Sequence, residues 1–527
     1  MEIKGIAHKI IKNTFFNSIG RFWAIALSMV LSPYIIHRIG VEQYGVWAIL
    51  SVITRYMGLF DFGVESSFIK YISENYTKKN YSKLNEVINT GFIFYIFFGA
   101  AVVAIGYFCI DYFILIFKIK ASLHKEIYAV FLICIISFGL QNAFNIFSTI
   151  QVSLQRMDIT NKVSIGLSLV YAGCTFYFLK NGYGLIGLVA SNAVIVLLGL
   201  VINIVISYNI LPELKINLPA FTRWETLKDM FSFGFKLQLG KLSLLVIYQL
   251  DKFLIGYFLS VSLVSYYHLG SAVVISVFTL CAILDMALAP ALVEIEAKGD
   301  RKRLVEAYLM STKYVSFVIV PIFAFTMTSA NNIMCLWMAD KTFSYAAAVI
   351  RILCAGFMVN VISHVSTQIC IAINRPKYIA VSSLLIVTAN AVISLAAIKL
   401  FGFPWVAFGT TSGLIIGSVY IIANVSKELG ISANTVLKTT VPFFLVCALV
   451  SLPLFAMNMF ISAYKIVLFS RIGWFAVITT EGLIFITLYF FCARRANFIA
   501  EKDLAFFKEK LKPFIPAAGT TTEITEG

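Results

Sequence analysis

The feature that most constrains this chain is a series of long apolar stretches, each of the length that crosses a lipid bilayer as a helix. A helix needs about 20 mostly apolar residues to span the ~30 Å hydrocarbon layer, and lipid-exposed backbone must satisfy its own hydrogen bonds. Charged residues or Pro and Gly separate fourteen such stretches, with approximate bounds 13–37, 45–70, 88–117, 127–153, 163–180, 184–208, 230–258, 266–291, 307–330, 346–371, 379–399, 404–426, 439–460 and 472–493. The sequence therefore predicts an all-α integral membrane protein with about 14 transmembrane helices.

The composition excludes the soluble classes of protein. Of the 527 residues, 60% are hydrophobic and only 13% are charged, about half the charged fraction of a soluble chain. A solvent-exposed enzyme, a disordered protein and a nucleic-acid-binding protein are therefore excluded. The net charge of +16 then has two interpretations, a positive bias of cytoplasmic loops or cations placed for an anionic cargo.

The distribution of the cations predicts the topology. With the N-terminus in the cytoplasm, the loops on that side hold 25 Lys and Arg, and the outer loops hold nine. Cytoplasmic loops carry an excess of Lys and Arg, so an even number of spans with both termini inside is favoured.

Fourteen charged residues lie within the apolar stretches, eight basic and six acidic. A central charge costs about 2.5–3.5 kcal/mol in a bilayer, so these side chains must face one another or water, and the helices enclose a polar cavity. The cations predicted to bind an anionic substrate there are Arg21, Arg55, Lys241, Lys252 and Arg351. The acids Asp61, Asp251 and Asp285 have two interpretations, either coupling-ion sites or buried ion pairs that fix helix packing, such as Asp61 with Arg55.

Two further helices carry polar faces of helical period. Candidate contacts to sugar hydroxyls are Asn142, Asn145, Asn360, His364 and Gln368. The same side chains could equally be interhelical hydrogen bonds that hold the bundle together. Both interpretations stay open.

The two halves of the chain resemble each other at an offset of about 217–224 residues. Asp61 and Asp285 each precede a basic loop, and Gly20-Arg21 is matched by Gly240-Lys241. Repeats of six spans are parallel, with the substrate site between them. The predicted domains are a six-helix bundle (1–212), a cytoplasmic linker (213–229), a second six-helix bundle (230–430), two extra helices (431–495) and an amphipathic, then disordered, cytoplasmic tail (496–527).

Motifs for chemistry are missing from the sequence. The nine cysteines are scattered without a Cys-x-x-Cys pair, the five histidines are dispersed, and no nucleotide-binding loop or nucleophile motif occurs. We therefore expect no catalytic residue, no metal and no cofactor, and a protein that is not an enzyme.

The chain resembles the oligosaccharide-lipid flippases of the MOP superfamily, the Wzx type. The resemblance rests on fourteen spans, two six-helix repeats, an extra C-terminal helix pair and the stretch Tyr44 to Glu74, YGVWAILSVITRYMGLFDFGVESSFIKYISE. It implies that a polyprenyl-pyrophosphate-linked repeat unit of O-antigen or capsule is moved to the outer leaflet by alternating access.

The resemblance also implies the setting of the protein. The partners would be membrane lipid, the lipid-linked oligosaccharide and polysaccharide polymerase machinery, with no nucleic acid. The location would be the bacterial inner membrane, with energy from an H⁺ or Na⁺ gradient or the membrane potential. Two alternatives are a cation-coupled exporter of drugs or metabolites and a flippase for the peptidoglycan lipid precursor, but eight intramembrane cations against six acids count against a drug exporter.

Overall fold

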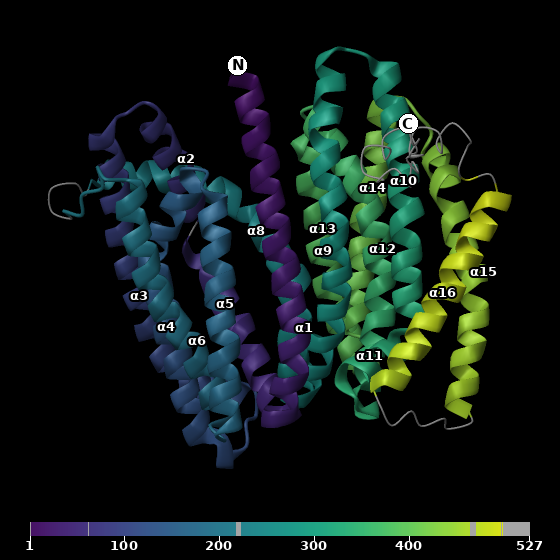
Figure 1. The fold of residues 1–527 in the computed structure, drawn as a ribbon, viewed down its shortest axis with the longest axis horizontal. Helices are drawn as coiled ribbons and strands as arrows, with labels where there is room; N and C mark the ends of the chain where they lie inside the picture. Colours follow the sequence, from purple (N-terminus) through teal and green to yellow (C-terminus); the bar gives the residue numbers. More distant parts are fainter. Residues whose placement is uncertain (1, 62, 218–222, 464–470, 497, 499–527) are drawn as a thin grey trace, which may run out of the picture.

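The computed structural model describes residues 2–61, 63–217, 223–463, 471–496 and 498, and in this part of the chain every regular element is a helix. Twelve of the described helices are long and apolar enough to cross a membrane. The prediction of an all-α integral membrane protein is therefore confirmed (Figure 1).

The helices follow the predicted stretches closely. Their bounds are α1 (Glu2–Met57), α2 (Val64–Thr77), α3 (Tyr81–Ile116), α4 (His124–Ser153), α5 (Met157–Lys180), α6 (Gly184–Ile210), α8 (Trp224–Phe258), α9 (Val261–Ala297), α10 (Arg301–Thr328), α11 (Ala330–Met338), α12 (Ser344–Ala372), α13 (Pro376–Leu400), α14 (Ala407–Leu429), α15 (Ala433–Ala463) and α16 (Arg471–Arg495). Three short 3-10 segments, Gly58–Asp61, Ala121–Leu123 and Lys341–Phe343, lie between them.

The second predicted stretch, 45–70, is not one helix, and this is a correction. Helix α1 is broken at Gly40, whose φ of 82° is outside the helical region, so α1 contains the first predicted span and the start of the second. It ends at Met57, and α2 begins only at Val64 after Gly63, which has φ 74°. The Gly63 amide donates to the Asp61 carboxylate over 2.8 Å, so the aspartate stabilises the break that apolar composition alone did not predict.

The predicted offset between the halves recurs in the backbone. Left-handed residues follow four helices of the first half and four of the second. They are Lys79 and Gly299, Lys118 and Ala339, Gln155 and Asn374, and Gly182 and Gly402. The separation is 220, 221, 219 and 220 residues in turn, so the same sequence of turns is built twice.

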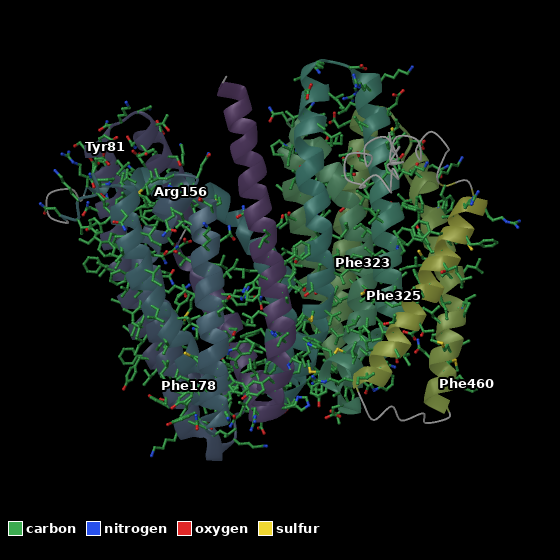
Figure 2. The ribbon with its side chains drawn as sticks, viewed as in Figure 1. Tyr81, Arg156, Phe178, Phe323, Phe325 and Phe460 are labelled. Atoms are coloured by element: carbon green, nitrogen blue, oxygen red, sulfur yellow. The ribbon has the colours of Figure 1, made fainter. Side chains whose placement is uncertain are left out.

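Two groups of helices lie side by side in Figure 1. Helices α1–α6 form the N-terminal bundle and α8–α14 form the C-terminal bundle, while α15 and α16 lie at the outer edge of the second bundle. Helix α8 begins against α2 of the N-terminal bundle and continues into the C-terminal bundle, where it packs on α9 and α13. Tyr81 and Arg156 lie at the end where α1 begins, which we call the terminal end, and Phe178 and Phe460 lie at the opposite end (Figure 2).

The segment between the bundles is bound to α3. Asn85 donates to the carbonyl of Glu213 over 2.9 Å and accepts from the Lys215 amide over 2.7 Å. One turn later, Asn89 donates to the Lys215 carbonyl over 2.7 Å and accepts from the Asn217 amide over 2.9 Å. The two asparagine side chains thus satisfy backbone hydrogen-bonding groups of residues 213, 215 and 217. The start of the predicted linker is therefore held against α3.

The C-terminal helix pair has a polar anchor. Glu481 of α16 is fully buried and accepts a hydrogen bond of 2.7 Å from Asn332 of α11. Asn332 also donates to Asn458 of α15 over 2.6 Å. These bonds join α11, α15 and α16. Residues 499–527 of the predicted amphipathic and disordered tail lie outside the described residues.

Candidate functional site

The two bundles contact each other toward the opposite end. Ser265 of α9 donates to the Val41 carbonyl over 2.6 Å, and the Trp337 indole of α11 donates to the Met29 carbonyl over 2.6 Å. Gly45 of α1 is buried against Val261, where an added Cβ would lie 2.1 Å from the Val261 carbonyl oxygen. These contacts bring the first helix of the N-terminal bundle directly onto the C-terminal bundle.

Predicted cations from both bundles come together beside this contact. Lys252 of α8 is only 5% exposed, and its ammonium donates to Gln249 over 3.2 Å. Arg55 of α1 lies close enough for its charge to act on both Lys252 and His268 of α9. Within the described residues no ion pair joins Arg55 or Lys252 to a carboxylate. Arg55 is exposed, Lys252 is buried and His268 is half-buried, and we call these three basic side chains between the bundles the cation cluster.

Aromatic side chains border the cation cluster. The His268 ring meets the rings of Tyr44 and Trp47 edge-on, with 5.7 Å between centroids in each case. Its buried Nδ1 has no hydrogen-bond partner among the described residues. A buried polar atom of this kind is costly unless a ligand or water satisfies it, so the cluster is a place where a bound group gains a partner.

Asp251 lies one residue before Lys252 and has a different environment. The carboxylate is 2% exposed and accepts hydrogen bonds from Tyr267, from Ser394 over 2.8 Å and from Thr410 over 2.6 Å. Asn390 in turn donates to the Thr410 hydroxyl over 2.7 Å. Helices α9, α13 and α14 thus each donate a hydroxyl to the buried carboxylate of α8, so four helices meet at this acid.

Asp61 is the other predicted acid whose side chain is described, and it is 6% exposed. One oxygen accepts from the Gly63 amide, and the second accepts from the Tyr95 hydroxyl over 3.2 Å. Its described contacts fix the break between α1 and α2.

The remaining predicted charges are spread along the bundles. Arg21 is exposed on α1, and Arg351 is partly exposed on α12. The side chains of Lys241 on α8 and Asp285 on α9 lie outside the described part of the structure.

The predicted sugar-contact residues differ in their surroundings. Asn142 donates to the Phe138 carbonyl of its own helix, and Asn145 donates to Glu65 over 3.2 Å. Asn360 donates to Ser418 over 3.4 Å, and the His364 ring meets Phe278 edge-on at 5.4 Å. Gln368 is partly exposed on α12. The asparagines thus make contacts within their own bundles.

A groove opens between α10 and α16. Its volume is about 300 Å³, and it is lined almost entirely by apolar atoms of Phe317, Val318, Pro321, Ile322, Phe325, Gly482, Phe485, Ile486, Tyr489 and Phe490. The groove offers hydrophobic contact to a chain-like apolar group.

Sequence reasoning missed the residues around Asp251. Asn390 and Ser394 are one helical turn apart on α13, and Tyr267 and Thr410 come from two other helices. Small polar residues at a spacing of four within an apolar helix were the available signal. Their convergence on Asp251 depends on packing between helices that are up to 159 residues apart.

Solved structures share this helical fold. The chain shares its fold with the lipid II flippase MurJ in an inward closed conformation, with a TM-score of 0.64, 14% identity, and 92% of this chain and 99% of that chain covered. It also resembles a multidrug resistance transporter of the MATE family of the MOP superfamily in an inward-facing conformation, with a TM-score of 0.60, 12% identity, and 78% and 94% covered.

Sequence comparison gives the family. The profile of the family described as "Polysaccharide biosynthesis protein" matches residues 38–344, so the chain belongs to that family. A relative named "Putative O-antigen transporter", from Shigella flexneri, is 23% identical over 373 residues, which is 70% of this chain and 87% of that protein. The predicted resemblance to flippases of the MOP superfamily is confirmed at the level of family and fold.

Proposed function

We propose that the protein is a flippase that moves a polyprenyl-pyrophosphate-linked oligosaccharide across the membrane for surface polysaccharide biosynthesis. The observation that carries the proposal is the cluster of Arg55, Lys252 and His268 between the bundles, which lacks carboxylate ion pairs in the described structure. The ammonium of Lys252 is buried, and a buried cation without a carboxylate partner costs free energy unless an anion binds beside it, while Arg55 offers a second, exposed cation. A pyrophosphate is an anion that could bind there, and membership of the polysaccharide biosynthesis family indicates that the rest of the cargo is a saccharide.

The apolar groove between α10 and α16 supports the lipid part of the cargo. A polyprenyl tail gains about 25 cal/mol for each Å² of apolar surface it buries, although lipid tails compete for the same contact. In this proposal the headgroup lies between the bundles while the tail stays at the outer helix pair.

Asp251 is our candidate for the coupling ion. Its carboxylate, the Ser394 and Thr410 hydroxyls, and the Asn390 amide oxygen form an oxygen-rich site suited to Na⁺ or H⁺. A cation there neutralises the buried acid next to Lys252. Such a cation drives transport only if it binds the inward- and outward-facing states with different affinity.

The orientation belongs to the same proposal. The loops that carry most Lys and Arg, such as those at Lys78 and Arg301, would face the cytoplasm of a bacterial inner membrane, with both termini inside. The bundles 1–212 and 230–430 would rock about their contact to alternate access.

The experiment is deletion of the gene followed by mass spectrometry of extracted lipids. Accumulation of polyprenyl-pyrophosphate carrying a complete sugar unit, with loss of surface polysaccharide, supports the proposal. Complementation by the wild type, but not by Arg55→Ala, links the step to the cation cluster. Lys298→Ala, which changes an exposed lysine at the terminal end, is the matched control. Normal lipids together with altered drug tolerance would favour a multidrug exporter instead.

A further inference from the structure

A polar cavity lies within the N-terminal bundle, and none of its lining residues belongs to the cation cluster or to the surroundings of Asp251. Its volume is about 160 Å³, and it is enclosed by α1, α4, α5 and α6. The lining residues on α1 are Trp47, Leu50, Ser51 and Thr54, which share one helix face. The others are Cys134, Phe138 and Gln141 of α4, Tyr171 of α5, and Val189 and Asn192 of α6.

The lining is polar and uncharged. The Ser51 hydroxyl donates to the Trp47 carbonyl over 2.9 Å, and the Thr54 hydroxyl donates to the Leu50 carbonyl over 3.1 Å, so both oxygens keep lone pairs for a ligand. The amides of Gln141 and Asn192 are exposed, and neither has a hydrogen-bond partner among the residues that the structure describes. Each amide offers donors and an acceptor together.

This combination selects a class of ligand. Sugar hydroxyls are donors and acceptors at once, and amide side chains match both roles. The apolar face of a sugar ring packs against aromatic side chains, which Trp47 and Tyr171 supply here. A phosphate would need a cation, and no Lys or Arg lines the cavity. The volume lies below the roughly 300–1,000 Å³ of sites for larger ligands, so it suits a single ring.

We propose that this cavity, defined by Trp47, Gln141, Tyr171 and Asn192, binds one neutral sugar ring of the glycan. The inference rests on the proposed function and deepens it by placing the sugar in the N-terminal bundle beside the cations. Arg55 directly follows Thr54 on α1, so a ring in the cavity lies next to the charge that takes the pyrophosphate. The predicted candidates Asn142 and Asn145 are not among the lining residues.

The cavity also borders the contact between the bundles. Trp47 forms part of its wall and meets His268 of α9 at 5.7 Å. A sugar ring packed on Trp47 therefore changes the free energy of the inter-bundle contact, and movement of the bundles changes the wall of the sugar site. Cargo occupancy and bundle position are coupled through this one indole.

The first test uses Trp47 as the reporter. In a variant with Trp23, Trp224, Trp405 and Trp474 replaced by Phe, which keeps the inter-bundle bond of Trp337, N-acetylglucosamine should give a saturable change in fluorescence that a further Trp47→Phe substitution abolishes. Gln141→Leu and Asn192→Leu should each weaken the affinity about tenfold, the loss of roughly one hydrogen bond. Asn424→Leu, whose amide donates to its own helix at Tyr420, should leave the affinity unchanged. Glucuronate, an anionic sugar, should bind more weakly than N-acetylglucosamine.

A second measurement keeps the proposal testable if the variant with four Phe substitutions does not fold. Cys134 lines the cavity, so in the native protein N-acetylglucosamine should slow its alkylation by a small thiol reagent, measured by mass spectrometry. The sugar site is overturned if the sugar does not slow alkylation of Cys134 and the double variant Gln141→Leu/Asn192→Leu flips normally. This result leaves the proposed flippase function intact. Protected Cys134 in a protein that flips no lipid-linked sugar supports the sugar site and overturns the proposed function.

Discussion

The indole nitrogen of Trp337 donates a hydrogen bond of 2.6 Å to the backbone carbonyl of Met29, joining residues 308 positions apart. The donor belongs to the C-terminal bundle and the acceptor to α1. With the Ser265–Val41 bond, also 2.6 Å, it fastens the two bundles toward the opposite end. In the proposed alternating-access cycle, opening that end breaks both bonds, so each contributes to the free energy of the closed state.

Trp337→Phe should shift the protein toward opening at that end. The loss of one hydrogen bond costs about 1 kcal/mol, a roughly fivefold change in the equilibrium. Spin labels on α1 and α11, measured by pulsed electron paramagnetic resonance, should report a larger population with a long inter-bundle distance. Trp405→Phe is the control, since Trp405 is 49% exposed and its ring lies tilted against Phe401 of its own bundle. An unchanged distance distribution in Trp337→Phe would show that this bond does not stabilise the closed state.

Gly45→Ala should weaken the same contact by a steric route. The new Cβ would lie 2.1 Å from the Val261 carbonyl oxygen, so α1 and α9 must move apart. Overpacking of this kind costs about 1–3 kcal/mol. The measurement is flipping rate together with the inter-bundle distance. Gly173→Ala, where an added Cβ meets nothing within 4 Å, should instead be tolerated.

Lys252→Met should raise thermal stability and abolish transport. The substitution removes a buried ammonium, whose burial costs free energy, and keeps the side-chain volume. Replacing buried charges by apolar residues is often neutral or stabilising by about 1–4 kcal/mol. A thermal melt of the detergent-purified protein and the lipid-accumulation assay give the two readouts. A lower melting temperature would mean that Lys252 stabilises the fold.

Asp251→Asn should abolish ion-driven transport with little effect on folding. The amide keeps one acceptor for Thr410 but cannot bind Na⁺ or a proton as a carboxylate does. In proteoliposomes the wild type should respond to an imposed Na⁺ or pH gradient and the variant should not. Asp111→Asn, an exposed acid on α3, is the matched control. Equal responses in the wild type and in Asp251→Asn would show that the coupling ion does not bind at Asp251.

Cysteine labelling tests the orientation. In a variant with the native cysteines replaced by serine, Lys79→Cys should react only with reagents that cross the inner membrane. Asn181→Cys, at the other end of the N-terminal bundle, should react with impermeant reagents from outside. The reverse pattern would invert the proposed topology.

Much of the fold was predictable because the bilayer imposes length and hydropathy on every span. The break at Gly63 was not, since it depends on an Asp61 hydrogen bond inside a continuous apolar run. At the site, the cations Arg55 and Lys252 stood out as charges in apolar helices. Ser394, Thr410 and Asn192 did not, because small polar residues are common in spans and acquire a role only through the helices packed against them.

The turns that repeat about 220 residues apart bear on how the chain arose. Lys79 matches Gly299 and Lys118 matches Ala339, so the backbone path is shared while the side chains are not. This is the pattern left when a half-length gene is duplicated and fused. Once joined, the copies were free to diverge: Asp251 has Leu31 as its counterpart 220 positions earlier. An ancestral symmetric dimer would have carried an acid at this position in both copies or in neither, whereas the fused chain carries it in one half alone.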